Sequence, residues 1–147
     1  LLGCFVALAP ASGQAPAGVA HLKAPPTVEA QAHAAAVAVF DVRIDSGFHI
    51  QSNHPKLEYL IPSSLEIAPV GGIVVTGVIW PPAAEHKFSF SPDVLTVFEG
   101  DIKVQVRMRT GGSGEHTMHG SFRYQACNDE LCRPPVTVPF TFQVDVR

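Results

Sequence analysis

The sequence predicts an all-β domain, namely an immunoglobulin-like two-sheet β-sandwich. Residues 36–45 show a period of two, the pattern of a half-buried strand: Ala36, Ala38, Phe40, Val42 and Ile44 alternate with Val37, Val39, Asp41, Arg43 and Asp45. Further short segments rich in Val, Ile, Thr and Phe follow, separated by turn sequences that contain Gly, Pro, Asn and Asp. No long window shows a convincing helical stripe of apolar residues. Short strands at this spacing are typical of a sandwich.

The expected strands follow one another along the chain, and turn sequences separate most of them. Their residue ranges are 36–45, 48–52, 64–68, 73–80, 94–98, 102–109, 117–125 and 136–146. Gly47 breaks the first strand, Asn53-His54-Pro55 follows the second, and later turns contain residues 69–72, 99–101 and 111–114. Residues 81–93 are expected to form a long loop, and long loops in compact domains are usually functional.

Length and charge bound the class of function. The chain has 147 residues, which is enough for one domain that needs neither a metal nor a disulfide merely to fold. Its formal net charge is -3, from 10 Lys and Arg against 13 Asp and Glu, and the basic residues form no cluster. A nucleic-acid partner is therefore not expected, because nothing would hold a phosphate backbone at physiological salt.

The first twenty residues differ from the rest because they contain no charged side chain. The apolar block LLGCFVALAP and the small-residue run ASGQAPAGVA are typical of a secretory signal that lacks its basic start. Cys4 also fits a lipobox, in which a lipidated cysteine would tether the protein to a membrane. We expect a signal remnant over residues 1–20, an extended segment over 21–34 and the folded domain over 35–147, outside the cytoplasm.

Cys127 and Cys132 are the only cysteines of the expected folded domain, and an oxidising compartment would let them bond. Four residues separate them, so the loop they close is short and its entropic stabilisation is only roughly 2 kcal/mol. The pair is therefore better suited to being made and broken than to stapling distant strands. Asp129 and Glu130 disfavour a thiolate in this loop whereas Arg133 favours one, and the sequence leaves the balance open.

Several motifs resemble one known family. The run Tyr124-Gln125-Ala126-Cys127, with Cys132 and Pro134-Pro135, is similar to the redox segment of the N-terminal periplasmic domain of the thiol:disulfide interchange protein DsbD. The motifs GFHIQS at 47–52, LIP at 60–62, WPP at 80–82 and FEG at 98–100, followed by Pro139, stand in the order that this family shows. The resemblance covers residues from about 35 to 147.

The resemblance implies a domain that relays electrons by thiol:disulfide exchange, with no cofactor and no metal. It assigns Cys132 as the thiol that forms the mixed disulfide and Cys127 as its resolving partner. It also implies that residues 81–93 cap the cysteines through an aromatic ring, with Phe88 as the first choice, Phe90 as the second and Glu85 as a loose match to the family's acidic cap residues. The other residues expected near the site are His49, Tyr124, Gln125, Asp129, Glu130, Arg133 and Pro134.

The resemblance also implies partners and a location. A thioredoxin-like domain and a transmembrane electron-transfer protein of the DsbD or CcdA kind would supply electrons. A periplasmic disulfide isomerase or a thiol protein of cytochrome c maturation would receive them. The implied location is the periplasm, whether the chain is secreted, tethered by a lipid or the N-terminal part of an inner-membrane protein.

Two other hypotheses stand beside the relay. Residues 115–119, EHTMH, bring copper-type ligands together in the sequence, although on a strand His116 and Met118 would face one side and His119 the other. Alternatively, a secreted immunoglobulin-like binding module would keep the bond between Cys127 and Cys132 as a permanent staple. A reduction potential below about -300 mV would indicate a staple and not a relay.

Overall fold

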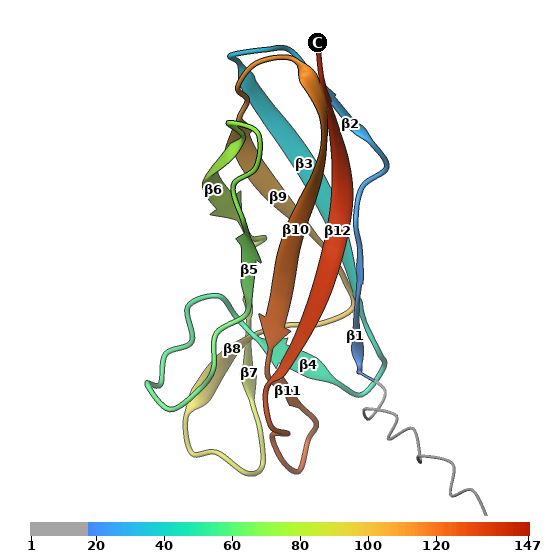
Figure 1. Ribbon diagram of the computed structural model, residues 1–147. Coiled ribbons are helices and arrows are strands. Elements are labelled where there is room, and N and C mark those ends of the chain that lie inside the picture. Colours follow the sequence, from blue (N-terminus) through green and yellow to red (C-terminus); the bar gives the residue numbers. More distant parts are fainter. Residues whose placement is uncertain (1–17) are drawn as a thin grey trace, which may run out of the picture.

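The structure is a computed structural model that describes residues 18–147, and this part of the chain forms an all-β sandwich without helices (Figure 1). Two four-stranded sheets face each other, and a third four-stranded sheet lies at one end. The predicted fold class, an immunoglobulin-like sandwich, is confirmed. Within residues 18–147, no helix is long and apolar enough to cross a membrane.

Each sheet combines strands that are distant in the sequence. The first has the order β1 (Ala20–Lys23), β3 (Ala35–Ile44), β9 (Asp101–Arg109) and β6 (Val74–Ile79). The second has the order β2 (Val28–Ala30), β12 (Val136–Val146), β10 (Gly114–Tyr124) and β5 (Ser64–Ile67). The third has the order β11 (Ala126–Cys127), β4 (His49–Gln51), β8 (Val94–Phe98) and β7 (Ala84–Lys87).

The main core lies between the first two sheets, as the alternation in β3 predicts. Every second residue near the end of β3 is buried: Ala38, Phe40, Val42 and Ile44. Phe40 meets Phe140 and Phe142 of β12 edge-on, with ring centroids 5.2 and 5.3 Å apart. Edge-to-face aromatic pairs of this kind contribute about 0.5–1.5 kcal/mol each beyond the burial of their surface. The two long sheets therefore form a rigid body on which the third sheet is mounted.

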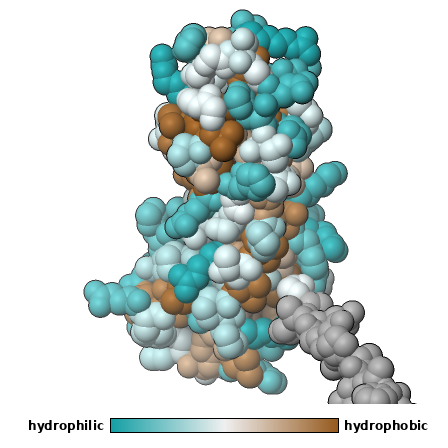
Figure 2. Space-filling view, in the orientation of Figure 1, coloured by the Kyte–Doolittle hydropathy of each residue, from teal (hydrophilic) through white to brown (hydrophobic). Residues whose placement is uncertain are grey.

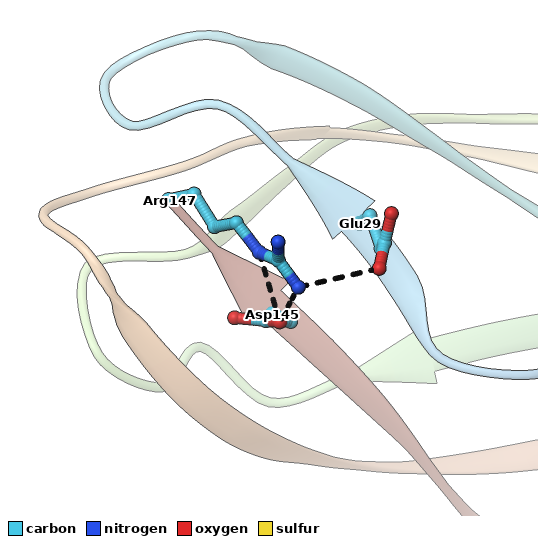
Figure 3. Close-up of polar contacts among 3 residues, drawn as sticks. All are labelled: Glu29, Asp145 and Arg147. Carbon is cyan, nitrogen blue, oxygen red and sulfur yellow. Dashed lines mark hydrogen bonds and ion pairs between the residues drawn. The ribbon is translucent and has the colours of Figure 1, made fainter.

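Arg147 fastens β2 to β12 at the end of the sandwich opposite the third sheet (Figures 1 and 3). Its guanidinium donates hydrogen bonds to the carboxylate of Asp145, at 3.1 Å from Nη2 and 3.3 Å from Nε, and to Glu29 at 3.5 Å. The hydrogen bond to Asp145 and the nearby negative charges raise the pKa of Arg147. The backbone adds two hydrogen bonds, from Arg147 N–H to Ala30 and from Ala32 N–H to Arg147.

The sandwich begins earlier in the chain than the expected boundary at residue 35. β1 pairs with β3 and β2 pairs in parallel with β12, so the segment expected to be merely extended contributes two strands. Val19 and Ala20, which the sequence placed at the end of the signal remnant, are 8% and 5% exposed in the main core. Residues 1–17 of the expected signal, including Cys4, lie outside the described residues.

The expected loop over residues 81–93 also needs correction, because it contains β7. All four residues of β7 are exposed, so this strand has no buried face and no alternating pattern by which the sequence could reveal it. The other expected strands agree with observed ones to within a few residues, and 94–98 and 136–146 agree at both ends. β7 and β8 thus form a hairpin whose turn contains residues 88–93.

Candidate active site

A disulfide joins Cys127 and Cys132 at the end of the sandwich that carries the third sheet (Figure 1). The sulfur atoms are 2.02 Å apart and the Cα atoms 3.9 Å apart. Asn128 builds the turn between them, because its Oδ1 accepts hydrogen bonds from the N–H groups of Glu130 and Leu131, each at 2.9 Å. Such an Asx turn holds the loop in place from within.

The two cysteines differ in exposure. Cys127 is 0% exposed, whereas Cys132 is half-buried. Cys127 also accepts a hydrogen bond from Nε2 of Gln51 at 3.3 Å. Because exchange requires an incoming thiolate to reach a sulfur directly, Cys132 offers the more accessible target.

The floor of the site is β4, in which His49, Ile50 and Gln51 are all buried. The strand lacks polar-apolar alternation because both of its faces are covered: Ile50 belongs to the main core, and His49 on the opposite face lies under Phe88 of the β7–β8 hairpin. His49 pairs with Cys127 across the sheet and Ile50 pairs with Ala126. Burial of the imidazole lowers the pKa of His49 to about 4, with a smaller lowering from His86, so this ring is neutral near pH 7. Its Nε2 is buried and has no hydrogen-bond partner among the described residues.

The β7–β8 hairpin covers this floor with aromatic rings. Phe88 is only 3% exposed and stacks on His49 with ring centroids 4.0 Å apart. It also stacks on His86 at 4.6 Å and on Phe90 at 5.3 Å. Phe88 belongs to a small second core, separate from the main one, with Leu57, Leu60, Leu95 and Val97. Of the two expected cap residues, Phe88 is therefore the buried ring, whereas Phe90 is 37% exposed.

The hairpin turn is tied directly to the cysteine loop. The hydroxyl of Ser89 donates a hydrogen bond of 2.7 Å to the backbone carbonyl of Asp129. The side chains of Asp129 and Glu130 are exposed, so these carboxylates border the disulfide on the solvent side. Glu85 points elsewhere: it forms an ion pair with Lys56, which lowers the pKa of its carboxyl. This pair holds β7 to the segment that contains residues 53–62.

The remaining residues expected near the site fix the strands that carry the cysteines. Gln125 bridges two segments, since its Oε1 accepts from Ile61 N–H at 3.0 Å and its Nε2 donates to the carbonyl of Arg133 at 3.4 Å. The guanidinium of Arg133 lies 4.5 Å from the ring centroid of Phe48. Tyr124 is buried in the main core. Together with Arg133 and Pro134 it lines a cavity of about 370 Å³ beside the exit of the cysteine loop.

Two exposed apolar side chains lie at the end of the sandwich that carries the site. Tyr59 is 70% exposed and Leu131 is 51% exposed, and both lie in loops of the end that carries the disulfide. Figure 2 shows hydrophobic surface interspersed with polar residues at this end of the molecule. Leu131 directly precedes Cys132 in the chain, so an exposed apolar side chain lies beside the half-buried cysteine and is suited to contact with another protein.

The copper-type residues do not converge in the described part of the chain. On β10, Met118 is buried in the main core, His116 packs against Gly71 and Gly114, and His119 is exposed. Among residues 18–147, no three His, Cys, Asp or Glu side chains are placed to hold one metal ion.

Comparison with known proteins gives the family. Residues 19–143 match the model of the family described as thiol:disulfide interchange protein DsbD, N-terminal. A comparison with curated protein sequences finds no match. Among solved structures, the reduced N-terminal domain of Neisseria meningitidis DsbD superposes with a TM-score of 0.53 at 18% identity, over 75% of this chain and 78% of that one.

A second solved structure is the N-terminal periplasmic domain of ScsB from Proteus mirabilis. It superposes with a TM-score of 0.59 at 12% identity and is matched over 86% of this chain. The chain spans only 46% of that protein's length. At such identities the two structures show a shared fold, and the family model covers most of the sequence. At the general level the chemistry of this family is thiol:disulfide interchange, for which Cys127 and Cys132 are the available pair. The chain therefore belongs to the family of N-terminal domains of the thiol:disulfide interchange protein DsbD.

Proposed function

We propose that this domain relays electrons outside the cytoplasm by reversible reduction of the bond between Cys127 and Cys132. The observation that carries this proposal is the asymmetric burial of the pair, with Cys127 fully buried and Cys132 only half-buried. A short bond at the end of the sandwich crosses no part of the core, so opening it leaves both long sheets paired.

In the proposed reaction, a thiolate of a thioredoxin-like domain attacks Sγ of Cys132. The bond between the two cysteines breaks, a mixed disulfide forms at Cys132, and Cys127 leaves as a thiolate. The second thiol of the donor then resolves the mixed disulfide, so the donor becomes a disulfide and this domain becomes a dithiol. In the second half of the cycle the reduced Cys132 attacks a disulfide of the recipient, and Cys127 resolves that intermediate.

The proposed partners follow from family membership. The donor is a thioredoxin-like domain fed by a transmembrane electron-transfer protein. The recipient is a periplasmic disulfide isomerase or a thiol protein of cytochrome c maturation. We propose the periplasm as the location, with the segment before residue 18 acting as the secretion signal. The N-terminal domain of ScsB from Proteus mirabilis, which shares this fold, is a periplasmic domain and supports this location.

We further propose that the β7–β8 hairpin is a cap and that Phe88 is its key ring. Its burial on His49 and the hydrogen bond from Ser89 to Asp129 support this role. A cap that covers the site slows exchange with unselected thiols without changing the equilibrium potential, because it blocks the attack geometry. A docked partner would displace the hairpin.

Trapping of the mixed disulfide tests the proposal. The partner is a variant of a thioredoxin-like domain that keeps only its attacking cysteine. That cysteine is first converted to a mixed disulfide with an aromatic thiol, and the activated partner is then mixed with Cys127→Ser or Cys132→Ser. Cys127→Ser, which keeps the reachable sulfur, should form a stable adduct on a non-reducing gel, and Cys132→Ser should not. Equal trapping by both variants would contradict the assigned roles. A wild-type potential below about -300 mV, with no reaction toward thioredoxin-like donors, would instead identify a structural staple.

A further inference from the structure

Gln51 makes a hydrogen bond to the sulfur that leaves when the disulfide is attacked. Its Nε2 lies 3.3 Å from Sγ of Cys127, and both side chains are 0% exposed. The two residues are 76 positions apart in the sequence and meet because β4 and β11 are neighbours in the third sheet. Among the described residues this is the one hydrogen bond to either sulfur.

Two hydrogen bonds fix the main chain of Gln51 and so position the base of its side chain. The N–H of Gln51 donates to the carbonyl of Gln125 at 3.0 Å, and the carbonyl of Gln51 accepts from the hydroxyl of Ser63 at 2.6 Å. The side-chain Oε1, in contrast, is buried without a partner among the described residues. A fully buried amide with an unsatisfied oxygen is unfavourable for folding alone, so its presence beside a reacting sulfur calls for a chemical explanation.

We propose that Gln51 stabilises the thiolate of Cys127 as the leaving group of the exchange reaction. This inference rests on the proposed function of the disulfide. When an incoming thiolate bonds to Cys132, the bond to Cys127 breaks and its electron pair stays on Sγ of Cys127. Negative charge thus develops on a sulfur that water cannot reach. The N–H of Gln51 is the donor in position to meet it, and a hydrogen bond to a charged acceptor is roughly twice as strong as one to a neutral acceptor.

The same side chain also suits the reduced state. The donor's second thiolate attacks its own sulfur in the mixed disulfide and releases Cys132 as a thiolate. The donor dithiol has then lost two electrons and two protons, and Cys127 and Cys132 have gained them as two thiols. Once protonated, the S–H of Cys127 becomes a donor. The amide oxygen of Gln51, which has no partner among residues 18–147, is the type of acceptor that this donor needs.

Two substitutions separate this role from simple packing. Gln51→Met keeps the volume and removes the donor, whereas Gln51→Glu keeps the shape and donates only while its carboxyl is protonated. Gln105→Met, at an exposed position of β9, is the matched control. The titratable and charged groups around this end include His49, His86, Glu99, Asp129, Glu130 and Arg133, and they are the same in every variant.

The measurement is the rate at which dithiothreitol reduces the oxidised protein, followed by quenching and mass spectrometry between about pH 5 and pH 8. We expect Gln51→Met to react about tenfold more slowly than wild type at every pH, which is the effect of one lost hydrogen bond to a charged group. Gln51→Glu should approach the wild-type rate at the acidic end and fall increasingly behind as the pH rises. Gln105→Met should match wild type throughout.

A second measurement reads the thiolate itself. In the reduced Cys132→Ala background, Gln51→Met should raise the pKa of Cys127, measured by the ultraviolet absorbance of the thiolate, so that its acid dissociation constant falls about tenfold. Wild-type rates in Gln51→Met, or the same slowing of both Gln51 variants at every pH, would overturn the inference and leave the proposed function standing. A wild-type disulfide that resists dithiothreitol would overturn both.

Discussion

Replacement of Phe88 by alanine should speed reduction of the disulfide by small thiols such as glutathione by up to about 100-fold. The reduction potential should remain nearly unchanged, because the oxidised and the reduced forms both lose the contacts of the ring. The chain should stay folded, since Phe88 belongs to the small second core and not to the main one. The affected equilibrium is therefore opening of the β7–β8 hairpin.

The magnitude follows from the surroundings of the ring. Phe88 is 3% exposed, and burial of a phenylalanine side chain contributes about 1.5–3 kcal/mol. Its stack on His49 and its contact with Phe90 add about 0.5–1.5 kcal/mol for each well-formed aromatic pair. A loss of about 3 kcal/mol in the free energy that closes the hairpin corresponds to roughly two powers of ten in the open population. The reduction rate rises by this full factor of about 100 if opening of the hairpin exposes the Phe88 ring completely.

The assay follows loss of the disulfide under excess glutathione by alkylation and mass spectrometry, and equilibration in glutathione buffers gives the potential. Phe90→Ala is the matched control, because its ring lies in the same turn but is 37% exposed, and its rate should rise only a few-fold. An unchanged rate in a folded Phe88→Ala protein would refute the reasoning. A large shift in potential would show that the ring acts on the bond itself and not on access to it.

Three further outcomes are expected. The pKa of His49 is about 4 in the folded protein against an ordinary value of 6.5, so the unfolded chain takes up the proton first as the pH falls; stability present above about pH 6.5 is lost toward pH 4. Denaturant titrations should show the free energy of unfolding falling by about 2 kcal/mol between about pH 7 and pH 5. His49→Phe should remove this part of the pH dependence, whereas His119→Gln should leave it in place. Gly120→Ala should lower the melting temperature, because a Cβ there would lie 2.5 Å from the ring of Phe140. Ser89→Ala should loosen the hairpin by about 1 kcal/mol and raise the glutathione rate about fivefold, with no change in potential.

The sequence revealed those strands that bury one face. β8 and β12 were predicted at both ends because apolar residues mark their buried sides. The sequence did not predict β7, because all of its residues are exposed, or β11, because it has only two residues. β1 was missed because its first residue, Ala20, ends the uncharged small-residue run that resembles a signal, although Ala20 is buried in the main core. An alternating sequence pattern indicates only which residues of a strand are buried. It could not indicate β1, β7 and β11, because these strands are held in place by pairing with neighbouring strands.

Part of the site could be found from the sequence and part could not. Cys127 and Cys132 stand in a recognisable motif, and Phe88 stands in the segment that the resemblance marks as a cap. The structure brings the disulfide and the ring to the same end of the sandwich. Ser89 gave no such signal, because its hydrogen bond reaches a residue 40 positions away. Gln51 stands in the GFHIQS motif, but nothing in that motif indicates its hydrogen bond to Cys127, 76 positions away. A polar residue within a strand acquires its role only when the opposite strand is known, which requires the sheet order.

The exposed strand β7 has a consequence for solubility. In the described part of the chain it pairs only with β8, so its outer edge presents backbone N–H and C=O groups to solvent. Such an edge invites strand addition from another molecule. The side chains of Glu85, His86 and Lys87 oppose this, because a second copy docking edge to edge would have to strip water from closely spaced polar groups. The hairpin that we propose as the cap is thus itself protected from edge-to-edge association by these polar side chains.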